Sequence, residues 1–412
     1  MTEWQVKKVG DIADTQLGKM LNKGKQSGKH AKPYLRTDNV HWGRFDLSEI
    51  KEMDILPEEQ DKYLATKGDL LMCEGGASGR TALWNEDYNI SFQNHVHRIR
   101  PKDPKEISPK YLLYYFEWFI KNGFASDLIK GVTISSLSQS SLRSIEVTYP
   151  LVDEQHKIVE LLEDHLSRLD AALADVKQAK IKAAQFRRSI LRAAFSGKFI
   201  QETGYGEANW AISELGELCT FITDGSHNPP KGIEKSEYLM LSSRDINNGE
   251  LTFDKPRYLS KKDFESENKR TDLQMDDVLL TTVGTIGRTA IFAGVPKNVT
   301  FQRSVSVLRP NKLKISSKFL MYFLDSITDV LNREARGVAQ QGIYLNQVRK
   351  LEIPVPSLEE QIFLVELLDD HLSRLDSSFA LADLIENQSA ALRRSLLQAA
   401  FSGQLTNEVV SV

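Results

Sequence analysis

A lysine-rich loop near the start of the chain carries side chains that could bind phosphate. Between positions 19 and 32 there are five lysines and no acid, namely Lys19, Lys23, Lys25, Lys29 and Lys32. Lysines in such a loop can neutralise the phosphates of DNA, although a solvated loop without a ligand explains the same composition. We therefore treat Lys23, Lys25 and Lys29 as candidate DNA-binding residues.

The second half of the chain offers a different set of polar side chains. A loop at residues 224–231 has the sequence Asp-Gly-Ser-His-Asn-Pro-Pro-Lys. Elsewhere an arginine follows a glycine-rich turn in each half, where it could reach a phosphate or a guanine edge, or could equally hold its own turn. The further DNA-binding candidates are His227, Asn228, Lys231, Arg80, Arg288 and Gln340.

No catalytic motif is complete in this sequence. Asn228-Pro229-Pro230-Lys231 is similar to the Asn-Pro-Pro-aromatic loop of amino-methyltransferases, but lysine replaces the aromatic and no strand–Gly-x-Gly–helix unit accompanies it. Gly18 and Gly24 enclose five residues rather than four, which excludes a P-loop. His95 and His97 lack further metal ligands. We predict a binding protein with no catalytic residue, metal or cofactor of its own.

The composition is that of an ordinary globular protein. The chain has 412 residues, of which 41% are hydrophobic and 26% charged, and its net charge is −3. This length allows two or three domains, and without an apolar stretch of about 18 residues we expect no membrane span. Cys73 and Cys219 are too few for a disulfide framework and fit a reducing, cytoplasmic setting. Because the net charge is slightly negative, any DNA binding must come from local basic patches.

The sequence contains one unit twice, at an offset of 206 residues. Residues 154–198 and 360–404 agree at 24 of 45 positions without gaps. Elsewhere the match is weaker, as in Gly79-Arg80-Thr81-Ala82 with Gly287-Arg288-Thr289-Ala290, and Phe92-Gln93 with Phe301-Gln302. The repeat indicates the order variable domain, helix, variable domain, helix.

Both strongly repeated segments carry a heptad pattern that predicts a coiled coil. In the first copy the expected contact positions are Ile158, Leu162, His165, Leu169, Ala172, Val176, Ala179, Ala183, Phe186, Ile190 and Ala193. The second copy repeats this spacing from Leu364 to Ala399, with His371 in place of His165. We expect both histidines to be packed between the helices rather than to bind a metal.

The ends and charges of these segments bear on how the helices pair. Ser357 and Glu360 have capping-box spacing, and Gly197 and Gly403 suit a left-handed helix end. In the first copy acids precede bases, so antiparallel pairing within the chain would set opposite charges together and agree with both helix dipoles. This would give a pseudo-twofold repeat. A parallel coiled coil between two chains is the alternative.

The remaining segments predict two domains of one fold. Residues 1–150 and 204–356 show short strands separated by turns, with one apolar aromatic run each, at 111–116 and 319–324, which we predict to be a buried helix. Residues 151–203 and 357–412 hold the spacer helices with their linker and tail. The expected class is α+β, with two domains separated by two long antiparallel coiled-coil helices.

The doubled segment resembles a known family. The residues that carry the resemblance, with their counterparts between Gly337 and Gln404, are Gly131, Leu142, Ile145-Glu146-Val147, Pro150, Glu154-Gln155, Ile158, Leu161-Leu162 and Ala193-Ala194-Phe195-Ser196-Gly197-Lys198. This arrangement is similar to the DNA-specificity (S, HsdS) subunit of type I restriction–modification systems, over the whole chain.

The resemblance implies a division of labour among several subunits. Each variable domain would be a target-recognition domain for one half of a bipartite double-stranded DNA site. The helices would set the gap and dock methyltransferase (M) subunits, two of them, which carry the adenine methylation, and restriction (R) subunits would join them. The chain itself would be non-catalytic and would need no membrane. Base-contacting residues do not transfer by motif, because recognition domains of this family diverge between targets. The first copy lacks the Asp-Gly-Ser-His element of the second, so we expect the two loops to contact DNA differently.

The same resemblance implies that partners bind repeated residues of the two helices. These are Glu154, Gln155, Arg187, Arg188, Phe195, Glu360, Gln361, Arg393, Arg394 and Phe401. Two other functions stay open from the sequence, a scaffold or decoy that does not recognise DNA, and a degenerate methyltransferase, against which the missing cofactor motif argues.

Overall fold

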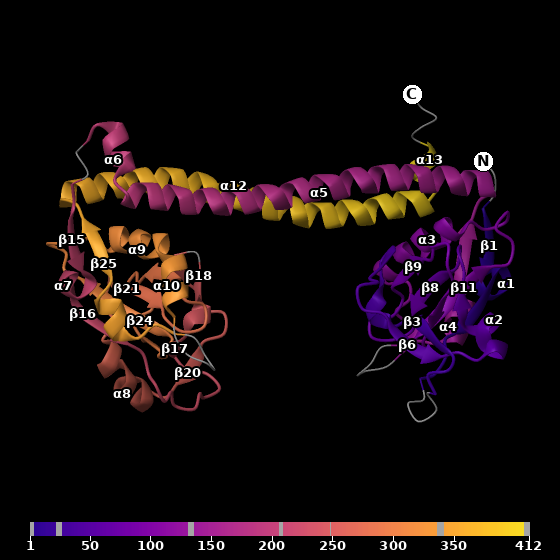
Figure 1. Ribbon diagram of the computed structural model, residues 1–412, viewed down its shortest axis with the longest axis horizontal. Helices are drawn as coiled ribbons and strands as arrows, with labels where there is room; N and C mark the ends of the chain where they lie inside the picture. The colour runs from indigo at the N-terminus through magenta and orange to yellow at the C-terminus, as the bar shows by residue number, and fades with distance from the viewer. Residues whose placement is uncertain are drawn as a thin grey trace. The chain divides into compact units, whose positions relative to one another are not determined.

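The chain folds into two β-rich domains and two long helices. This computed structural model describes residues 4–21, 27–130, 136–205, 209–247, 249–335 and 342–407. It divides into unit 1, residues 1–176 with 383–412, and unit 2, residues 177–382. Each unit holds one domain and one half of both long helices, α5 (Val152–Phe195) and α12 (Leu358–Phe401) (Figure 1). The predicted α+β class with two spacer helices is confirmed.

The core of domain 1, the part of unit 1 before α5, contains two four-stranded sheets and a helix. The first sheet has the order β2 (Ala13–Leu17), β11 (Val96–Pro101), β8 (Leu70–Cys73) and β9 (Thr81–Leu83). The second has the order β6 (Lys51–Asp54), β3 (Ala31–Leu35), β10 (Ile90–Phe92) and β7 (Leu64–Ala65). Strand β8 is buried throughout, because one face packs on the second sheet and the other on helix α3 (Pro109–Lys121).

Domain 2, which lies in unit 2, repeats this plan. Its first sheet has the order β16 (Cys219–Asp224), β24 (Val305–Pro310), β21 (Val278–Thr281) and β22 (Thr289–Ile291). Its second has the order β20 (Arg257–Leu259), β17 (Tyr238–Leu241) and β23 (Val299–Phe301). Helix α9 (Ser317–Ser326) takes the place of α3, and helix α8 (Lys261–Thr271) follows β20. The predicted strands and the buried aromatic helix of each domain are confirmed.

In each unit one helix of the domain packs on both long helices. In unit 1, α3 shares a core with Ile158 and Leu162 of α5 and with Leu397 and Phe401 of α12. In unit 2, α9 shares a core with Ile190, Leu191, Leu364 and Leu368, which again come from both long helices. Each domain is therefore fixed by the start of one long helix and the end of the other.

Ion pairs within each unit give the direction of the two long helices. In unit 1, Arg393 Nη1 of α12 lies 3.6 Å from Asp170 Oδ1 of α5. In unit 2, Arg187 Nη1 of α5 lies 2.8 Å from Asp376 Oδ1 of α12. As the residue number rises along α5 it falls along α12, so the pairing is antiparallel, as predicted.

The contact positions between the helices differ from the predicted heptad by one residue at every second site. Leu162, Leu169, Val176 and Ile190 are shielded as expected, but His165 and Ala172 are exposed, and Phe186 is 58% exposed. The shielded residues are instead one place later, at Leu166, Leu173, Arg187 and Ala194. Burying Leu166 and Leu173 removes more apolar surface from water than burying His165 and Ala172 would. The prediction that His165 is packed was therefore wrong, whereas His371 is half-buried beside Phe199.

The helix ends follow the sequence signals. Ser357 Oγ accepts a hydrogen bond from Glu360 N at 3.2 Å, and Glu360 Oε2 accepts one from Ser357 N at 2.9 Å, which is a complete capping box. Gly197 and Gly403 have φ values of 79° and 76°, the left-handed conformation that glycine adopts without strain. Within the described residues no helix is both long and apolar enough to cross a membrane.

Candidate nucleic-acid interface

In both domains a loop glycine lies against a turn between two strands. Gly18 N donates a hydrogen bond to Val96 O at 3.0 Å, and Gly225 N donates one to Val305 O at 3.1 Å. A Cβ atom on Gly18 would lie 2.3 Å from Gln93 O, and one on Gly225 would lie 2.1 Å from Phe301 O. Because these neighbours are backbone atoms, only glycine allows the loop to come so close.

The two turns are residues 93–95, between β10 and β11, and residues 302–304, between β23 and β24. Four backbone hydrogen bonds of 2.9 to 3.1 Å hold each of them. In turn 302–304 the donor–acceptor pairs are Gln302–Leu241, Arg303–Ser226, Thr282–Ser304 and Val305–Gln302. In turn 93–95 they are Gln93–Leu35, Asn94–Lys19, Glu74–His95 and Val96–Gln93. The backbone of the two turns is therefore fixed in the same way.

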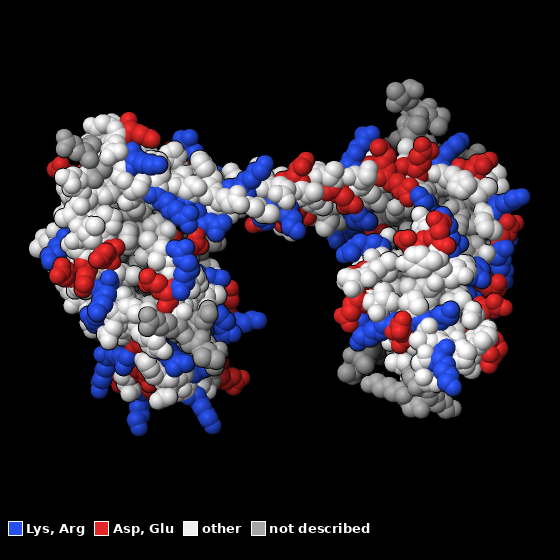
Figure 2. All heavy atoms as spheres, viewed as in Figure 1, with Lys and Arg blue, Asp and Glu red and all other residues white. Residues whose placement is uncertain are grey.

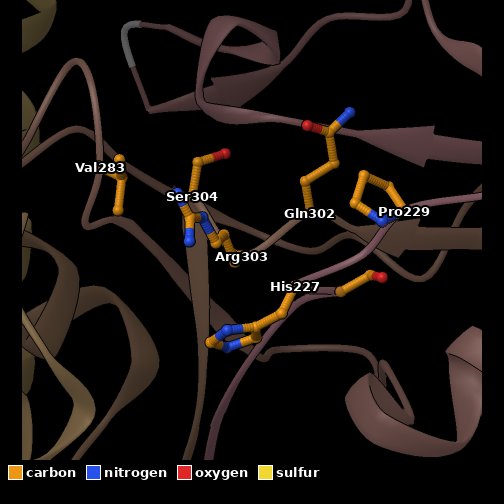
Figure 3. Close-up of a pocket in the computed structure, with 7 residues that line it drawn as sticks. His227, Pro229, Val283, Gln302, Arg303 and Ser304 are labelled. Atoms are coloured by element: carbon orange, nitrogen blue, oxygen red, sulfur yellow. The ribbon is translucent and has the colours of Figure 1, made fainter. Parts of the chain in front are cut away.

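In domain 2 the loop and the turn together line a hollow of about 340 Å³. Its lining residues are Ser226, His227, Pro229, Val283, Gln302, Arg303 and Ser304. Figure 3 shows His227 and Pro229 on one chain segment and Gln302, Arg303 and Ser304 on the turn beside it. The lining offers hydrogen-bond donors and acceptors with little apolar surface, which suits a polar ligand rather than a lipid-like one.

An acid behind the hollow orients His227. His227 Nε2 lies 2.8 Å from Asp224 Oδ2, and the imidazole is 53% exposed. Arg270 of α8 donates to the other oxygen of Asp224 and, through Nε, to its backbone carbonyl at 2.9 Å. Both oxygens of Asp224 are thereby occupied, so its charge is already balanced within the domain.

Three basic side chains of domain 2, at or near the lining of the hollow, have no bonding partner among the described residues. Lys231, Arg244 and Arg303 are exposed, and their side chains make no hydrogen bond or ion pair with the residues that the structure describes. Figure 2 shows further Lys and Arg side chains projecting from the end of unit 2 that carries α8 and β20. Free cations beside a polar hollow favour an anionic partner.

The same positions in domain 1 are less basic. Lys19, at the place of Ser226, forms an ion pair with Glu59. Asp38 stands at the place of Arg244 and pairs with Arg36 at 3.3 Å, and Asn94 stands at the place of Arg303. The two domains thus present different chemistry on the same backbone.

The two arginines predicted from glycine-rich turns bond to segments of their own domains, although Arg288 remains exposed. Arg80 Nη2 donates to Thr37 O at 3.0 Å. Arg288 Nη1 donates to Asn247 Oδ1 at 2.5 Å and to Ile246 O at 3.3 Å. Each guanidinium ties its turn to a neighbouring segment, and these contacts favour the structural alternative for both residues.

The other predicted DNA-binding residues divide into two groups. Lys29, Asn228 and Lys231 are exposed, and Lys29 follows a loop whose backbone is anchored on Asp54 through Gly28 N at 3.0 Å. Lys23, Lys25 and Gln340 lie outside the described residues. Among the described residues no group of three or more His, Cys, Asp or Glu side chains could hold a metal ion.

Sequence reasoning missed turn 302–304 and turn 93–95 as candidate sites. A signal was present, because Phe92-Gln93 matches Phe301-Gln302 and the residues that follow differ. What the sequence did not show is the contact with Gly18 and Gly225, which brings each loop to its turn.

Two of the helix residues predicted to bind partners are fully buried inside the chain. Gln155 Oε1 accepts from Ser108 N at 2.9 Å, and its Nε2 donates to Glu106 O and Pro150 O. Gln361 makes the same three bonds, with Ser316 N, Lys314 O and Pro356 O. Both glutamines are 0% exposed, so we assign them to fixing each domain on its helix rather than to partner contacts.

The two phenylalanines predicted to bind partners also pack against their own domains. Phe401 packs edge-to-face on Tyr111 and Tyr115 of α3, and Phe195 packs in the same way on Phe319 and Phe323 of α9. Glu360, besides closing the capping box, accepts a hydrogen bond from Trp210 Nε1 at 3.3 Å. These residues stabilise the junctions between domains and helices.

The buried acid of α3 and its counterpart in α9 sit in different surroundings. Burial raises the pKa of Glu117, but hydrogen bonds from Arg393 (3.0 Å) and Lys121 (2.6 Å) outweigh it, and the pKa lies below its ordinary value. At the place of Glu117, burial raises the pKa of Asp325 to about 6, despite a hydrogen bond from Thr289 and the nearby charge of Arg187. Arg187 pairs with Asp376 instead.

Of the predicted partner-binding residues, Arg188 and Arg394 remain open to solvent. They occupy equivalent positions in α5 and α12, are exposed, and make no hydrogen bond or ion pair with other described residues. Glu154 is partly exposed near the start of α5.

Comparison with known proteins is consistent across family, sequence and fold. The model of the type I restriction modification DNA specificity domain matches residues 1–183 and again 207–387. The specificity subunit of the type I restriction enzyme EcoBI from Escherichia coli is 29% identical over 306 residues, which cover 67% of this chain and 62% of that protein. The MjaX specificity subunit of Methanocaldococcus jannaschii is 22% identical over 371 residues, or 87% of this chain and 84% of that protein.

Two solved structures share the fold over nearly the whole chain. One, from a study of complex assembly and conformational transition in a type I restriction–modification system, has a TM-score of 0.75 at 18% identity and covers 98% of both chains. The crystal structure of the HsdS subunit from Thermoanaerobacter tengcongensis has a TM-score of 0.56 at 18% identity and covers 97% of both chains.

Proposed function

The chain belongs to the type I restriction–modification DNA-specificity family, and from this premise we propose that each of its two domains reads one half of a bipartite double-stranded DNA target. It is a specificity subunit, the non-catalytic component that directs methylation and restriction. The observation that carries the proposal is that both domains hold a loop and a turn in one backbone arrangement and equip it with different polar side chains.

Phosphate and base contacts divide between the described side chains. Lys29 and Lys231 are exposed cations that neutralise phosphates, and such contacts make affinity fall steeply with salt. His227 and Asn228 present donors and acceptors to base edges beside the hollow. Arg80 and Arg288 have a structural role, because each links its own glycine-rich turn to a neighbouring segment.

The antiparallel helices set the gap between the two half-sites and dock the M subunits. Phe186 and Leu392 occupy equivalent positions in α5 and α12 and are 58% and 50% exposed, each close in sequence to an exposed arginine, Arg188 or Arg394. An apolar side chain beside an arginine offers a partner both apolar contact and charge, and aromatic residues and arginine are enriched at protein–protein interfaces. Because the chain presents this combination twice, two copies of one M subunit bind it, and R subunits join the resulting complex.

A domain exchange tests the proposal. Residues 204–356 are replaced by the corresponding domain of another family member, and the chain is expressed with its M subunits. Methylated-base sequencing should show a two-part motif in which only one half has changed. A motif that changes in both halves, or a wild-type complex that methylates without any two-part motif, would refute the proposal, and the second result would favour a decoy.

Helix length tests the role of α5 and α12 separately. Four residues added to each helix lengthen it by about 6 Å, since the rise is about 1.5 Å per residue. The tolerated gap should grow by one to two base pairs while both half-sites keep their bases. An unchanged gap would show that the helices do not set it.

A further inference from the structure

The second residue of each turn has a fixed backbone and a side chain without an internal partner. Arg303 N donates to Ser226 O at 2.9 Å, and Asn94 N donates to Lys19 O at 3.0 Å, so both positions are held by the adjacent loop. Neither the Arg303 guanidinium nor the Asn94 amide makes a hydrogen bond within the described part of the chain. The folded domain therefore does not explain the choice of either side chain.

Several other arginines of the two domains, unlike Arg303 and Arg244, have acceptors among the described residues of their own domain. Arg309 donates to both oxygens of Asp277 at 2.9 Å, and Arg100 donates to both oxygens of Asp69 at 2.6 Å. Arg80 and Arg288 are bound to backbone or amide oxygens. An arginine needs an acceptor for its fork of N–H groups, and Arg303 finds none within the described residues.

The surroundings of Arg303 do not neutralise it. Asp224, the acid bonded to His227 of the lining, already uses its two oxygens for His227 and Arg270. The turn residue Ser304 uses its Oγ to accept a hydrogen bond from Ser243 N at 3.1 Å, which fixes that side of the hollow. The Arg303 guanidinium therefore lies on the fixed turn 302–304 at the hollow, where a hydrogen-bond acceptor of a ligand can reach it.

We propose that Arg303 recognises a guanine in the half-site of domain 2 and that Asn94 recognises an adenine in the half-site of domain 1. An arginine fork matches the O6 and N7 acceptors of guanine in the major groove, and an asparagine amide matches N6 and N7 of adenine. The inference rests on the proposed function, and it names the residues at which one backbone arrangement acquires two specificities.

The test uses the complete complex of this chain with its M subunits on a library of duplex DNA. The variants are Arg303→Ala, Arg303→Lys and Asn94→Ala. Lys297→Ala is the matched control, because Lys297 is an exposed cation of the same domain that bonds to no residue in the described ranges. Methylated-base sequencing measures the discrimination at every position of the motif. Thermal melting of each variant verifies that the fold is kept.

Both Arg303 variants should relax one guanine position about tenfold to a hundredfold and leave the other half-site unchanged. Asn94→Ala should relax one adenine in the other half by a similar factor, and Lys297→Ala should change neither half. The lysine variant is decisive, because it keeps the charge needed for a phosphate but loses the fork needed for guanine.

Three results would overturn the inference. The first is full discrimination in all variants. The second is a weakening of all sequences by Arg303→Ala that Arg303→Lys repairs, which would identify a phosphate contact. The third is loss of all methylation at an unchanged melting temperature. In each case a two-part motif from the wild-type complex would leave the proposed function standing, whereas its absence would refute that function first.

Discussion

The two domains share one backbone arrangement of loop and turn and differ in the side chains that are exposed around it. Gly18 and Gly225 bring a loop onto a turn in the same way, and matching backbone hydrogen bonds hold that turn. Around it, domain 2 has Arg244 and Arg303, whose side chains bond to none of the described residues, where domain 1 has Asp38 and Asn94. The difference teaches that the residues that hold the turn are shared between the copies, whereas the exposed residues around it differ, and our proposal assigns the specificity to these.

The attachment of each domain to the helices shows the same contrast. Gln155 and Gln361 make identical sets of hydrogen bonds. The charged contact has changed, because Glu117 pairs with Arg393 in unit 1, whereas Asp325 in unit 2 has no arginine bonded to it. Substitutions at equivalent positions should show how far the two halves are alike.

The largest effect is expected from Glu117→Gln. This change leaves Arg393 and Lys121 beside a neutral amide in a site where Glu117 is only 3% exposed. Breaking a buried ion pair on one side costs about 3 to 5 kcal/mol of unfolding free energy. The matched change Asp325→Asn removes no ion pair and should cost far less. Equal losses in urea denaturation would contradict the contrast between the halves.

The loop glycines should be equally intolerant in both domains. Gly18→Ala and Gly225→Ala place a Cβ within 2.3 and 2.1 Å of backbone atoms, so the loop must move. We expect each to lower the unfolding free energy by about 2 to 3 kcal/mol. Gly10→Ala serves as the control, since its Cβ would meet the Arg143 side chain at 3.1 Å. A mild effect at one loop glycine and a severe effect at the other would break the equivalence of the turns.

The buried acids Asp325 of α9 and Glu117 of α3 should make the stability of the two units depend on pH in opposite ways. The folded pKa of Asp325, about 6, lies above its ordinary 3.8. The folded state therefore binds this proton more tightly, and unit 2 gains about 1 to 3 kcal/mol as the pH falls from 7 towards 4. Asp325→Asn should remove this gain. The pKa of Glu117 is lowered instead, so its contribution is present above pH 4.5 and is lost on further acidification. Thermal melting as a function of pH measures both, and a pH response that persists in the Asn variant would contradict this assignment.

The smallest effect concerns single phosphate contacts. Lys29→Ala and Lys231→Ala should each weaken DNA binding of the complex on all sequences alike and reduce the slope of log affinity against log salt by about one. Both changes should leave the methylated motif unaltered. If either lysine instead contacts a base, its variant will relax one position and keep the salt slope.

Much of the fold was predictable because it is periodic. The repeat, the long helices, their antiparallel pairing and the buried aromatic helices follow from spacing and charge order. The contact register was half wrong, since a 4,3 spacing also fits His165 and Ala172, and only packing selects Leu166 and Leu173. Local periodicity does not rank two neighbouring helix faces of similar polarity.

The site was less predictable because its parts are far apart in the sequence. A glycine-rich turn suggested Arg80 and Arg288, but both side chains donate to oxygen atoms of neighbouring segments in their own domains. Arg303 and Asn94 gave no motif, and their importance emerges only when Gly225 and Gly18 are seen against the turns. The repeated helix motif likewise indicated a partner surface. In the structure, four of its residues instead contact the chain's own domains and attach them to the long helices, namely Gln155, Gln361, Phe195 and Phe401.

The central claim is that one backbone arrangement, used twice about an antiparallel helix pair, reads two different half-sites. It is tested most directly by a chain that carries the sequence of residues 1–150 in place of residues 204–356, expressed with its M subunits. Methylated-base sequencing should reveal an interrupted palindrome built from two copies of the half-site that domain 1 reads. A folded, methylating complex that keeps the original two unlike halves would contradict the account.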